Sequence, residues 1–221
     1  MKSKTGTKTS PKTSERAESF SRGVLRVIKG RRTIRRFRAK PVPMGALKRV
    51  LEAGNWAPFS VYAPEGRRLC ALVGEERDAA VEIVKKCPTI VKYLRAQYET
   101  SPYGHEQEWS DKARDFGRTM GNAPALIVTA VKITPERFPM MHNMAAAWTA
   151  TQNMMIQAAA EGLATGVVTF STRSVQAELV QRLRLTPGEW VVANVLNIGY
   201  ADDKPRPPQR SNDLIIIRGS K

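Results

Sequence analysis

The sequence has few of the residues that carry metal-dependent or nucleophilic chemistry. Its 221 residues include two cysteines and two histidines, and their spacing matches no zinc-binding pattern. We therefore predict no metal site. Cys70 and Cys87 are interpreted as reduced thiols of an intracellular protein, because cytosolic proteins rarely hold disulfides. His105 and His142 each stand alone and are interpreted as structural or solvated residues, although either has the chemistry of a general base.

Signature loops for nucleotide binding and for nucleophilic catalysis are absent as well. The chain contains no Gly-x-Gly-x-x-Gly loop and no Gly-Lys-Ser/Thr loop, so neither of these devices holds a phosphate here. It has no Gly-x-Ser-x-Gly elbow for a serine nucleophile. Yet 42% of the residues are hydrophobic, which supports a sizeable core. A folded chain without these groups indicates that any chemistry comes from a bound organic cofactor.

No apolar run approaches the roughly eighteen residues that cross a bilayer, so no membrane span is expected. The N-terminus is basic, but no apolar stretch typical of a signal peptide follows it. We therefore predict a cytoplasmic protein.

Acidic residues are scarce in the first 40 positions, where 14 Lys and Arg face only Glu15 and Glu18 for a net charge of +12. The whole chain carries +16, so the remaining residues carry only +4. A nearly balanced body argues against a nucleic-acid-binding surface over the whole molecule. A basic arm remains that could touch RNA, DNA or anionic lipid through its charge. Residues 1–13 are rich in Lys, Thr, Ser, Gly and Pro and are predicted to be disordered.

Helical and extended patterns are mixed through the rest of the chain. Predicted helices cover 14–29, with Ser14 as N-cap, and 44–55, 75–86, 88–98, 109–120, 140–161 and 174–184. Predicted strands cover 68–73, 125–131, 165–170 and 190–198, with a short β-rich patch at Leu214–Ile217 that needs a sheet edge in its own subunit or a neighbour's. The helix at 140–161 is rich in Ala and Met and is expected to be buried on more than one side, as a central or dimer-forming helix. These patterns predict one α/β or α+β domain over residues 14–221.

The stretch Arg31–Phe37 has four arginines in six residues, with a threonine between them. Arginine stays charged and offers a planar fork of donors that suits phosphate and other oxyanions. The cluster has three interpretations: a solvated charge run, a nucleic-acid contact, or a cradle for a phosphorylated cofactor.

Several motifs in register favour the third interpretation. The stretch Arg31–Phe37 is followed by Pro41–Pro43 and by a helix that ends in Ala57–Ser60. Later come a Gly-Leu-Ala-Thr turn at Gly162–Thr165 and a strand that ends in Val191–Tyr200. In this order, from about residue 24 to 218, the chain resembles the nitroreductase family of FMN-dependent oxidoreductases.

The resemblance implies an α+β fold with a central, mostly antiparallel sheet flanked by helices. It also implies a homodimer with FMN at the subunit interface and with the strand Leu214–Ile217 packed on the partner's sheet. Arg31, Arg32 and Thr33 would hold the phosphate and ribityl chain. Arg35 would lie beside the flavin pyrimidine, as the catalytic cation that stabilises the anionic reduced flavin.

Three further groups complete the site that the resemblance implies. Arg210, with Arg206 or Lys204, would close over the phosphate. Pro58, Phe59 and Ser60 would come from the partner subunit. Val167, Val168 and Thr169 would place backbone groups near flavin N5.

The loop after Pro58 departs from the family pattern. Phe59 stands where the family usually has Ser, and Tyr62 and Pro64–Gly66 stand where it has Asn and Gln-Pro-Trp. Either the loop has simply diverged, or Phe59 or Tyr62 stacks near the isoalloxazine and narrows the substrate pocket.

The predicted function is that of an FMN-dependent oxidoreductase with NAD(P)H as co-substrate. It would pass hydride through flavin N5, in two half-reactions, to a nitroaromatic, a quinone or a similar electron-poor acceptor. One alternative is a specialised flavin enzyme of the same fold, such as a dehalogenase or a flavin-fragmenting synthase. The other is a non-catalytic binding protein with a basic, nucleic-acid-contacting arm.

Overall fold

The computed structural model describes residues 11–59, 61, 66–87, 114–169, 172–205, 207, 210 and 214–217. Several sequence predictions lie outside these residues: the helix at 88–98, most of the arm that was predicted to be disordered, and the residues Ser60, Tyr62, His105 and Arg206. Cys70 and Cys87 are free thiols, as expected. Among the described helices, none combines the length and the hydropathy needed to cross a bilayer.

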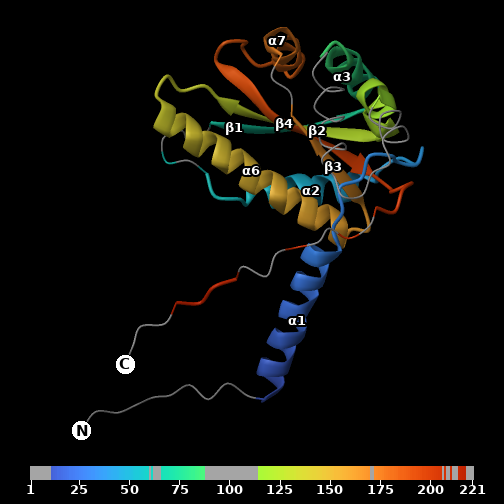
Figure 1. Ribbon diagram of the computed structural model, residues 1–221, viewed down its shortest axis with the longest axis vertical. Helices are drawn as coiled ribbons and strands as arrows, with labels where there is room; N and C mark the ends of the chain where they lie inside the picture. The colour runs from blue at the N-terminus through green and yellow to red at the C-terminus, as the bar shows by residue number, and fades with distance from the viewer. Residues whose placement is uncertain are drawn as a thin grey trace.

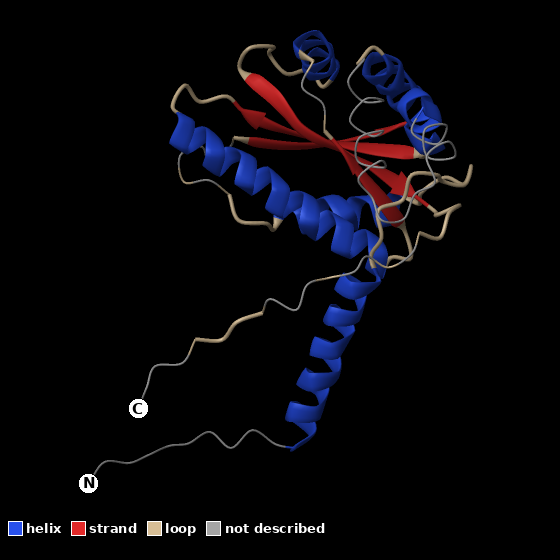
Figure 2. Ribbon diagram, viewed as in Figure 1, coloured by secondary structure: helices blue, strands red, loops and turns tan. Residues whose placement is uncertain are grey.

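A four-stranded sheet forms the centre of the molecule (Figure 2). Its strands are β1 (Arg67–Val73), β2 (Ala125–Lys132), β3 (Ala164–Val168) and β4 (Trp190–Gly199), in the order β1-β2-β4-β3. All three pairings are antiparallel, which confirms the predicted sheet. β2 and β4 are central and buried over most of their length. The continuous apolar run at 125–131 is typical of such a buried strand.

Helices cover both faces of the sheet (Figure 1). On one face lie α2 (Met44–Asn55) and the long α6 (Arg137–Ala160), and on the other lie α3 (Glu75–Lys85) and α7 (Arg173–Arg182). Each face has its own apolar core, the first with side chains of α2 and α6 and the second with side chains of α3 and α7. The fold is therefore the predicted α+β arrangement.

The long helix α6 packs against both the sheet and α2, which agrees with the expectation that it is buried on more than one side. It begins at Arg137 rather than at Met140. The contact with α2 is very close at Gly54, where an added Cβ would lie 2.7 Å from Cγ of Met154. At its C-terminal end, Gly162 adopts φ 72°, a left-handed cap that glycine takes without strain.

The helix α1 (Pro11–Gly30) projects from the body (Figure 1). It begins at Pro11, so the predicted N-cap at Ser14 and the predicted disorder of residues 11–13 were wrong. Proline is favoured at the first helical position because its fixed φ suits the helix and its missing N–H is not needed there. The apolar face of α1 lies open, and Phe20 is 75% exposed.

The patch Leu214–Ile217 forms no strand in the described chain. It runs away from the sheet (Figure 1), with each side chain at least 81% exposed. Pairing within its own subunit is therefore excluded for this conformation, and exchange with a partner stays a prediction.

Candidate functional site

The arginine-rich stretch lies along the edge strand β3 and the exit of β4. Its backbone is tied to three separate parts of the chain by hydrogen bonds of 2.9 Å, from Ile34 N to Thr165 O, from Phe37 N to Gly121 O and from Arg38 N to Tyr200 O. Because these partners are far apart in sequence, the stretch is fixed only in the folded protein.

A pocket of about 500 Å³ opens beside the start of this stretch. It is formed where the C-terminal ends of α1 and α6 meet the segment that follows β4, and its lining includes Arg31, Arg32, Gly162, Asp203 and Lys204. The volume is within the range of small-molecule and cofactor sites.

Positive charge converges on this pocket. Burial lowers the pKa of Arg31, and the charges of Arg210 and then Arg32 lower that pKa further. Among the residues that the structure describes, no carboxylate forms an ion pair with Arg31 or Arg32. The Arg32 Nη1 donates instead to the carbonyl oxygens of Lys29, at 2.7 Å, and of Arg31, at 2.9 Å. Mutual repulsion of this kind is relieved by a bound anion, so the donor set fits a phosphate group.

An acidic residue that the sequence interpretation missed lies in the same pocket. Asp203 is half-buried, and this burial raises its pKa against the opposing effects of the Arg35 backbone N–H and nearby guanidinium charges. Its Oδ2 accepts a long hydrogen bond of 3.4 Å from Arg35 N. Its Oδ1 is buried and has no hydrogen-bond partner in the described part of the chain. Asp203 Oδ1 can therefore accept a hydrogen bond from a hydroxyl group of a ligand. In the sequence, the available signal was the acidic pair Asp202-Asp203 at the start of an otherwise basic tail.

The Arg35 side chain turns toward the sheet. Its guanidinium carbon lies 5.0 Å from the ring centroid of Phe116, a cation–π arrangement. On its other side is Gly166 of β3, where an added Cβ would lie 3.0 Å from Arg35 Nη1 and would collide with the Ile34 carbonyl oxygen. Glycine at this position lets the arginine stretch approach β3 closely.

Thr33 is exposed, forms a backbone bridge with Thr165 of β3 and does not line the pocket. The other predicted site residues that the structure describes fall into two groups. Val167 is half-buried and Val168 is buried at the end of β3, and Thr169 is exposed just beyond it, so these three follow directly after Gly166. The loop with Pro58 and Phe59 lies after α2 and does not line the pocket, and Phe59 is 59% exposed. Within one chain, the structure thus gathers the arginines and β3 but leaves this loop apart from them.

The loop after α2 is fixed by Arg67 of β1, another residue that the sequence interpretation missed. Its guanidinium donates four hydrogen bonds of 2.8 to 3.2 Å to the carbonyl oxygens of Asn55, Ala57, Pro58 and Ala146. Burial lowers the Arg67 pKa. A short charge run in sequence did not reveal this role, because the carbonyl partners come together only in the fold.

Residues 28–200 match the sequence profile of the nitroreductase family. Because this match spans most of the chain, the protein belongs to the nitroreductase family, as the motifs predicted.

Among curated proteins, the chain is 28% identical to iodotyrosine deiodinase from Thermotoga neapolitana over 193 residues, which are 86% of this chain and 94% of that protein. Two solved structures share the fold. The FMN-dependent nitroreductase NfnB from Mycobacterium smegmatis in complex with NADPH has a TM-score of 0.69 at 20% identity, over 90% of this chain and 100% of that one. Iodotyrosine deiodinase bound to FMN and 3-iodo-L-tyrosine has a TM-score of 0.62 at 24% identity, over 89% and 96%.

Proposed function

We propose that this protein is an FMN-dependent oxidoreductase. The observation that carries the proposal is a pocket lined by Arg31 and Arg32, together with the charge of Arg210, which acts on Arg31. Neither Arg31 nor Arg32 forms an ion pair with a carboxylate among the described residues. Membership of the nitroreductase family and the FMN bound in solved relatives support the choice of FMN as the anion.

The residues of the pocket divide the work of holding such a cofactor. Arg31 and Arg32 bind the phosphate, with the charge of Arg210 acting beside Arg31, and Asp203 accepts a hydrogen bond from a hydroxyl group of the ribityl chain. When bound, FMN supplies a reversible acceptor and donor of hydride. Arg35 holds a fixed positive charge against β3, where it stabilises negative charge that develops on the ring system. No protein group is required to act as an acid or base in this scheme.

A second copy of the chain completes the site. The loop with Phe59 does not line the pocket of its own chain. Large apolar side chains are exposed on α1, on this loop, on α6 and at Leu214–Ile217, among other positions. Exposed apolar surface on this scale is typical of an interface. We propose a homodimer in which the partner's loop closes over the cofactor and the segment Leu214–Ile217 packs on the partner's sheet.

NAD(P)H is the proposed source of electrons, because one solved structure of the same fold is that of an FMN-dependent nitroreductase in complex with NADPH. Nitroaromatic compounds and quinones are the proposed acceptors. Reductive dehalogenation of a halogenated phenol is the second candidate. The identity to an iodotyrosine deiodinase over 94% of its length favours it.

Purified protein tests the cofactor first. The account expects a yellow protein that releases FMN on denaturation, or a colourless one that takes up added FMN. Protein that is colourless after incubation with FMN and removal of the unbound FMN would exclude the proposal.

Anaerobic reduction then separates the two candidate reactions. The loaded protein is mixed with NADH or NADPH and then with menadione, nitrofurazone or 3-iodo-L-tyrosine. Rapid reoxidation by the first two acceptors supports the oxidoreductase assignment. Iodide release from the third compound, without turnover of the first two, would replace it with the dehalogenase.

A further inference from the structure

A turn with unusual backbone geometry packs against Arg35. Residues 114–119 are helical and lead into a short 3-10 turn at Met120–Asn122. Met120, Gly121 and Asn122 have φ values of 52°, 68° and 56°, all in the left-handed region that residues other than glycine rarely adopt. Met120 is fully buried. Three successive left-handed residues persist only where the surrounding structure holds them, and such strain concentrates at functional sites.

The turn and the helical residues before it contact the arginine stretch at three points. The Gly121 carbonyl oxygen accepts a hydrogen bond of 2.9 Å from Phe37 N. An added Cβ on Gly121 would collide with the Arg35 carbonyl oxygen, so the two backbones are in direct contact. The ring of Phe116, one turn earlier, lies under the Arg35 guanidinium. Both the backbone and the side chain of Arg35 are therefore placed by residues 116–121.

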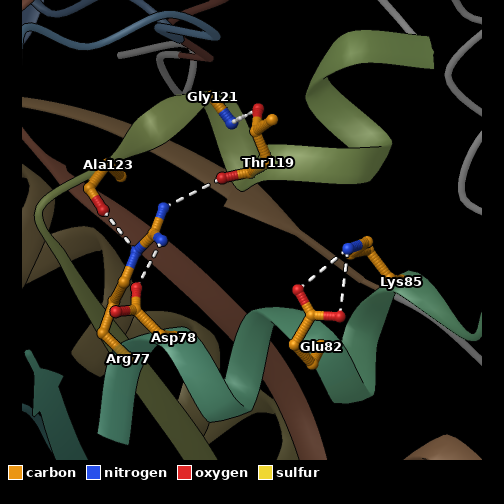
Figure 3. A network of polar contacts seen from close by, with 7 residues as sticks. All are labelled: Arg77, Asp78, Glu82, Lys85, Thr119, Gly121 and Ala123. Atoms are coloured by element: carbon orange, nitrogen blue, oxygen red, sulfur yellow. Dashed lines mark hydrogen bonds and ion pairs between the residues drawn. The ribbon is translucent and has the colours of Figure 1, made fainter. Parts of the chain in front are cut away.

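Arg77 of α3 braces this turn at both ends (Figure 3). Its Nε donates to the Ala123 carbonyl oxygen at 2.8 Å, and its Nη2 donates to the Thr119 carbonyl oxygen at 2.9 Å. The third donor, Nη1, lies 2.8 Å from Asp78 Oδ1 on the same helix. The Arg77 side chain is only 16% exposed. Two of its three hydrogen bonds are to backbone carbonyl groups on either side of the left-handed residues.

Thr119 adds a second brace from inside the turn. Its hydroxyl donates to the Asp115 carbonyl oxygen at 2.9 Å. The same hydroxyl accepts a hydrogen bond of 3.1 Å from Gly121 N (Figure 3). The left-handed residues are thus held between a side chain from α3 and a side chain of their own segment.

We propose that Arg77, through the Thr119–Ala123 turn, is a positioning residue for Arg35 and hence for the charge that Arg35 presents to the cofactor. This inference rests on the proposed function, since it concerns the residue beside the flavin. The planar fork of arginine spans two carbonyl groups at a fixed separation. A lysine offers a single charged nitrogen on a flexible stem and cannot bracket both carbonyls in this way.

Four full-length variants test the inference. Arg77→Met removes the donors but keeps the aliphatic stem, and Thr119→Val removes the second brace with little change of shape. Arg35→Gln removes the charge itself. The matched control is Lys85→Met, which removes a cation from the same helix whose ion pair with Glu82 does not touch the turn (Figure 3).

The first readout is amide hydrogen exchange at Phe37 in protein without cofactor. Loss of charge-assisted hydrogen bonds to the turn should speed exchange by about tenfold in Arg77→Met, because such a bond contributes enough to change an opening equilibrium by that factor. Lys85→Met should match the wild type. Exchange at Phe37 that is equal in the wild type and Arg77→Met would overturn the inference, whether or not the protein binds FMN. If Arg77→Met does not fold, Thr119→Val gives the same comparison.

The second readout is the midpoint potential of the bound flavin. Arg77→Met should lower it in the same direction as Arg35→Gln, and the double variant should be no lower than Arg35→Gln alone. A purely structural role for Arg77 would leave the potential unchanged or give additive shifts, and either result would overturn the inference. Wild-type protein that binds no FMN would instead contradict the proposed function. The exchange measurement would still test whether Arg77 holds the backbone at Phe37, because it needs no bound cofactor.

Discussion

Arg31 occupies an unfavourable place in the protein without a ligand. Burial and the charges of Arg210 and Arg32 all disfavour its protonated form, which is the only form an arginine adopts in practice. Burial of Arg31 and the charge of Arg210, which is far from it in sequence, therefore act in the folded state but not in the unfolded chain. Residues that bind ligands commonly lower stability in this way.

Replacement of Arg31 should separate stability from binding. In Arg31→Met the repulsion is relieved, so the melting temperature of the cofactor-free protein should rise, while that of Lys48→Met, an exposed residue on α2, should match the wild type. Thermal unfolding followed by circular dichroism measures both. A lower melting temperature in Arg31→Met would show that the charge is compensated within the protein.

The sequence motifs identified Arg31, Arg32 and Arg210 because their order along the chain follows a family pattern. Asp203, Arg67 and Arg77 could not be found in this way. Each acts on backbone groups or on a pocket formed by segments far apart in sequence, and the neighbouring charges in the sequence do not indicate which partners these are. The Gly121-Asn122 pair was a local signal for a left-handed turn, but it stood at the end of a predicted helix.

At the scale of elements, the contact between the arginine stretch and β3 depends on a missing side chain. A Cβ on Gly166 would meet the Ile34 carbonyl oxygen, a backbone atom that cannot swing aside. In contrast, a Cβ on Gly45 of α2 would meet only Arg49 Nη1, at 3.5 Å.

The two glycines should therefore respond oppositely to alanine. Gly166→Ala should destabilise the protein by about 1 to 3 kcal/mol, the usual cost of overpacking, and should weaken FMN binding. Gly45→Ala should be neutral or slightly stabilising, since alanine favours a helix over glycine. Urea unfolding measures both. Equal stability of the two variants would contradict the close approach of the stretch to β3.

An ion pair links α2 to the end of α6. Arg49 donates to both carboxylate oxygens of Glu161, at 2.6 and 2.7 Å. This hydrogen bonding, together with a hydrogen bond from Gln157 and the Arg49 charge, lowers the pKa of Glu161 from 4.5 to about 2. Because the folded-state pKa is depressed, the stabilisation is present above about pH 4.5 and is lost as the pH falls toward 2.

Stability against pH reports on this link. The difference in melting temperature between the wild type and Arg49→Met should be constant near neutral pH and should shrink between pH 4.5 and 2. The Arg49 side chain is 54% exposed, and solvent screening of its charge keeps the difference small. A difference that grows on acidification would assign the effect to another group.

Most element boundaries followed from apolar periodicity, and α2 was predicted to the residue. Errors occurred where the deciding contact is not local. The start of α1 was set by Pro11 rather than by the Ser14 cap, and Leu214–Ile217 has strand-forming residues but no strand beside it in its own chain. A strand needs a partner, and the sequence of one chain does not say in which molecule that partner lies.

In the whole molecule, the apolar face of α1 is exposed and is available to pack against a second copy of the chain. Phe20, Val24, Leu25 and Ile28 are each at least 40% exposed on a helix that projects from the body. Their exposure in a single chain agrees with the proposed dimer and has no explanation in a monomer.

Charge placed on this face should break the assembly. Leu25→Glu should shift the protein from dimer to monomer in sedimentation velocity and should weaken FMN binding, because the partner's loop would be lost. Arg22→Glu is a control on the same helix, and its side chain is 70% exposed. A wild-type protein that sediments as a monomer at micromolar concentration would contradict the dimer, and with it the role given to Phe59.

The central claim is that Arg31, Arg32 and Arg210 form a phosphate cradle for FMN. Titration of the cofactor-free protein with FMN and with riboflavin, which lacks the phosphate, tests it most directly. We expect the wild type to bind FMN at least about a hundredfold more tightly than riboflavin, because several charge-assisted hydrogen bonds to the phosphate would give a difference of this size. In Arg31→Met this preference should fall about tenfold, with riboflavin affinity unchanged. Equal affinity of the wild type for FMN and riboflavin would contradict the claim.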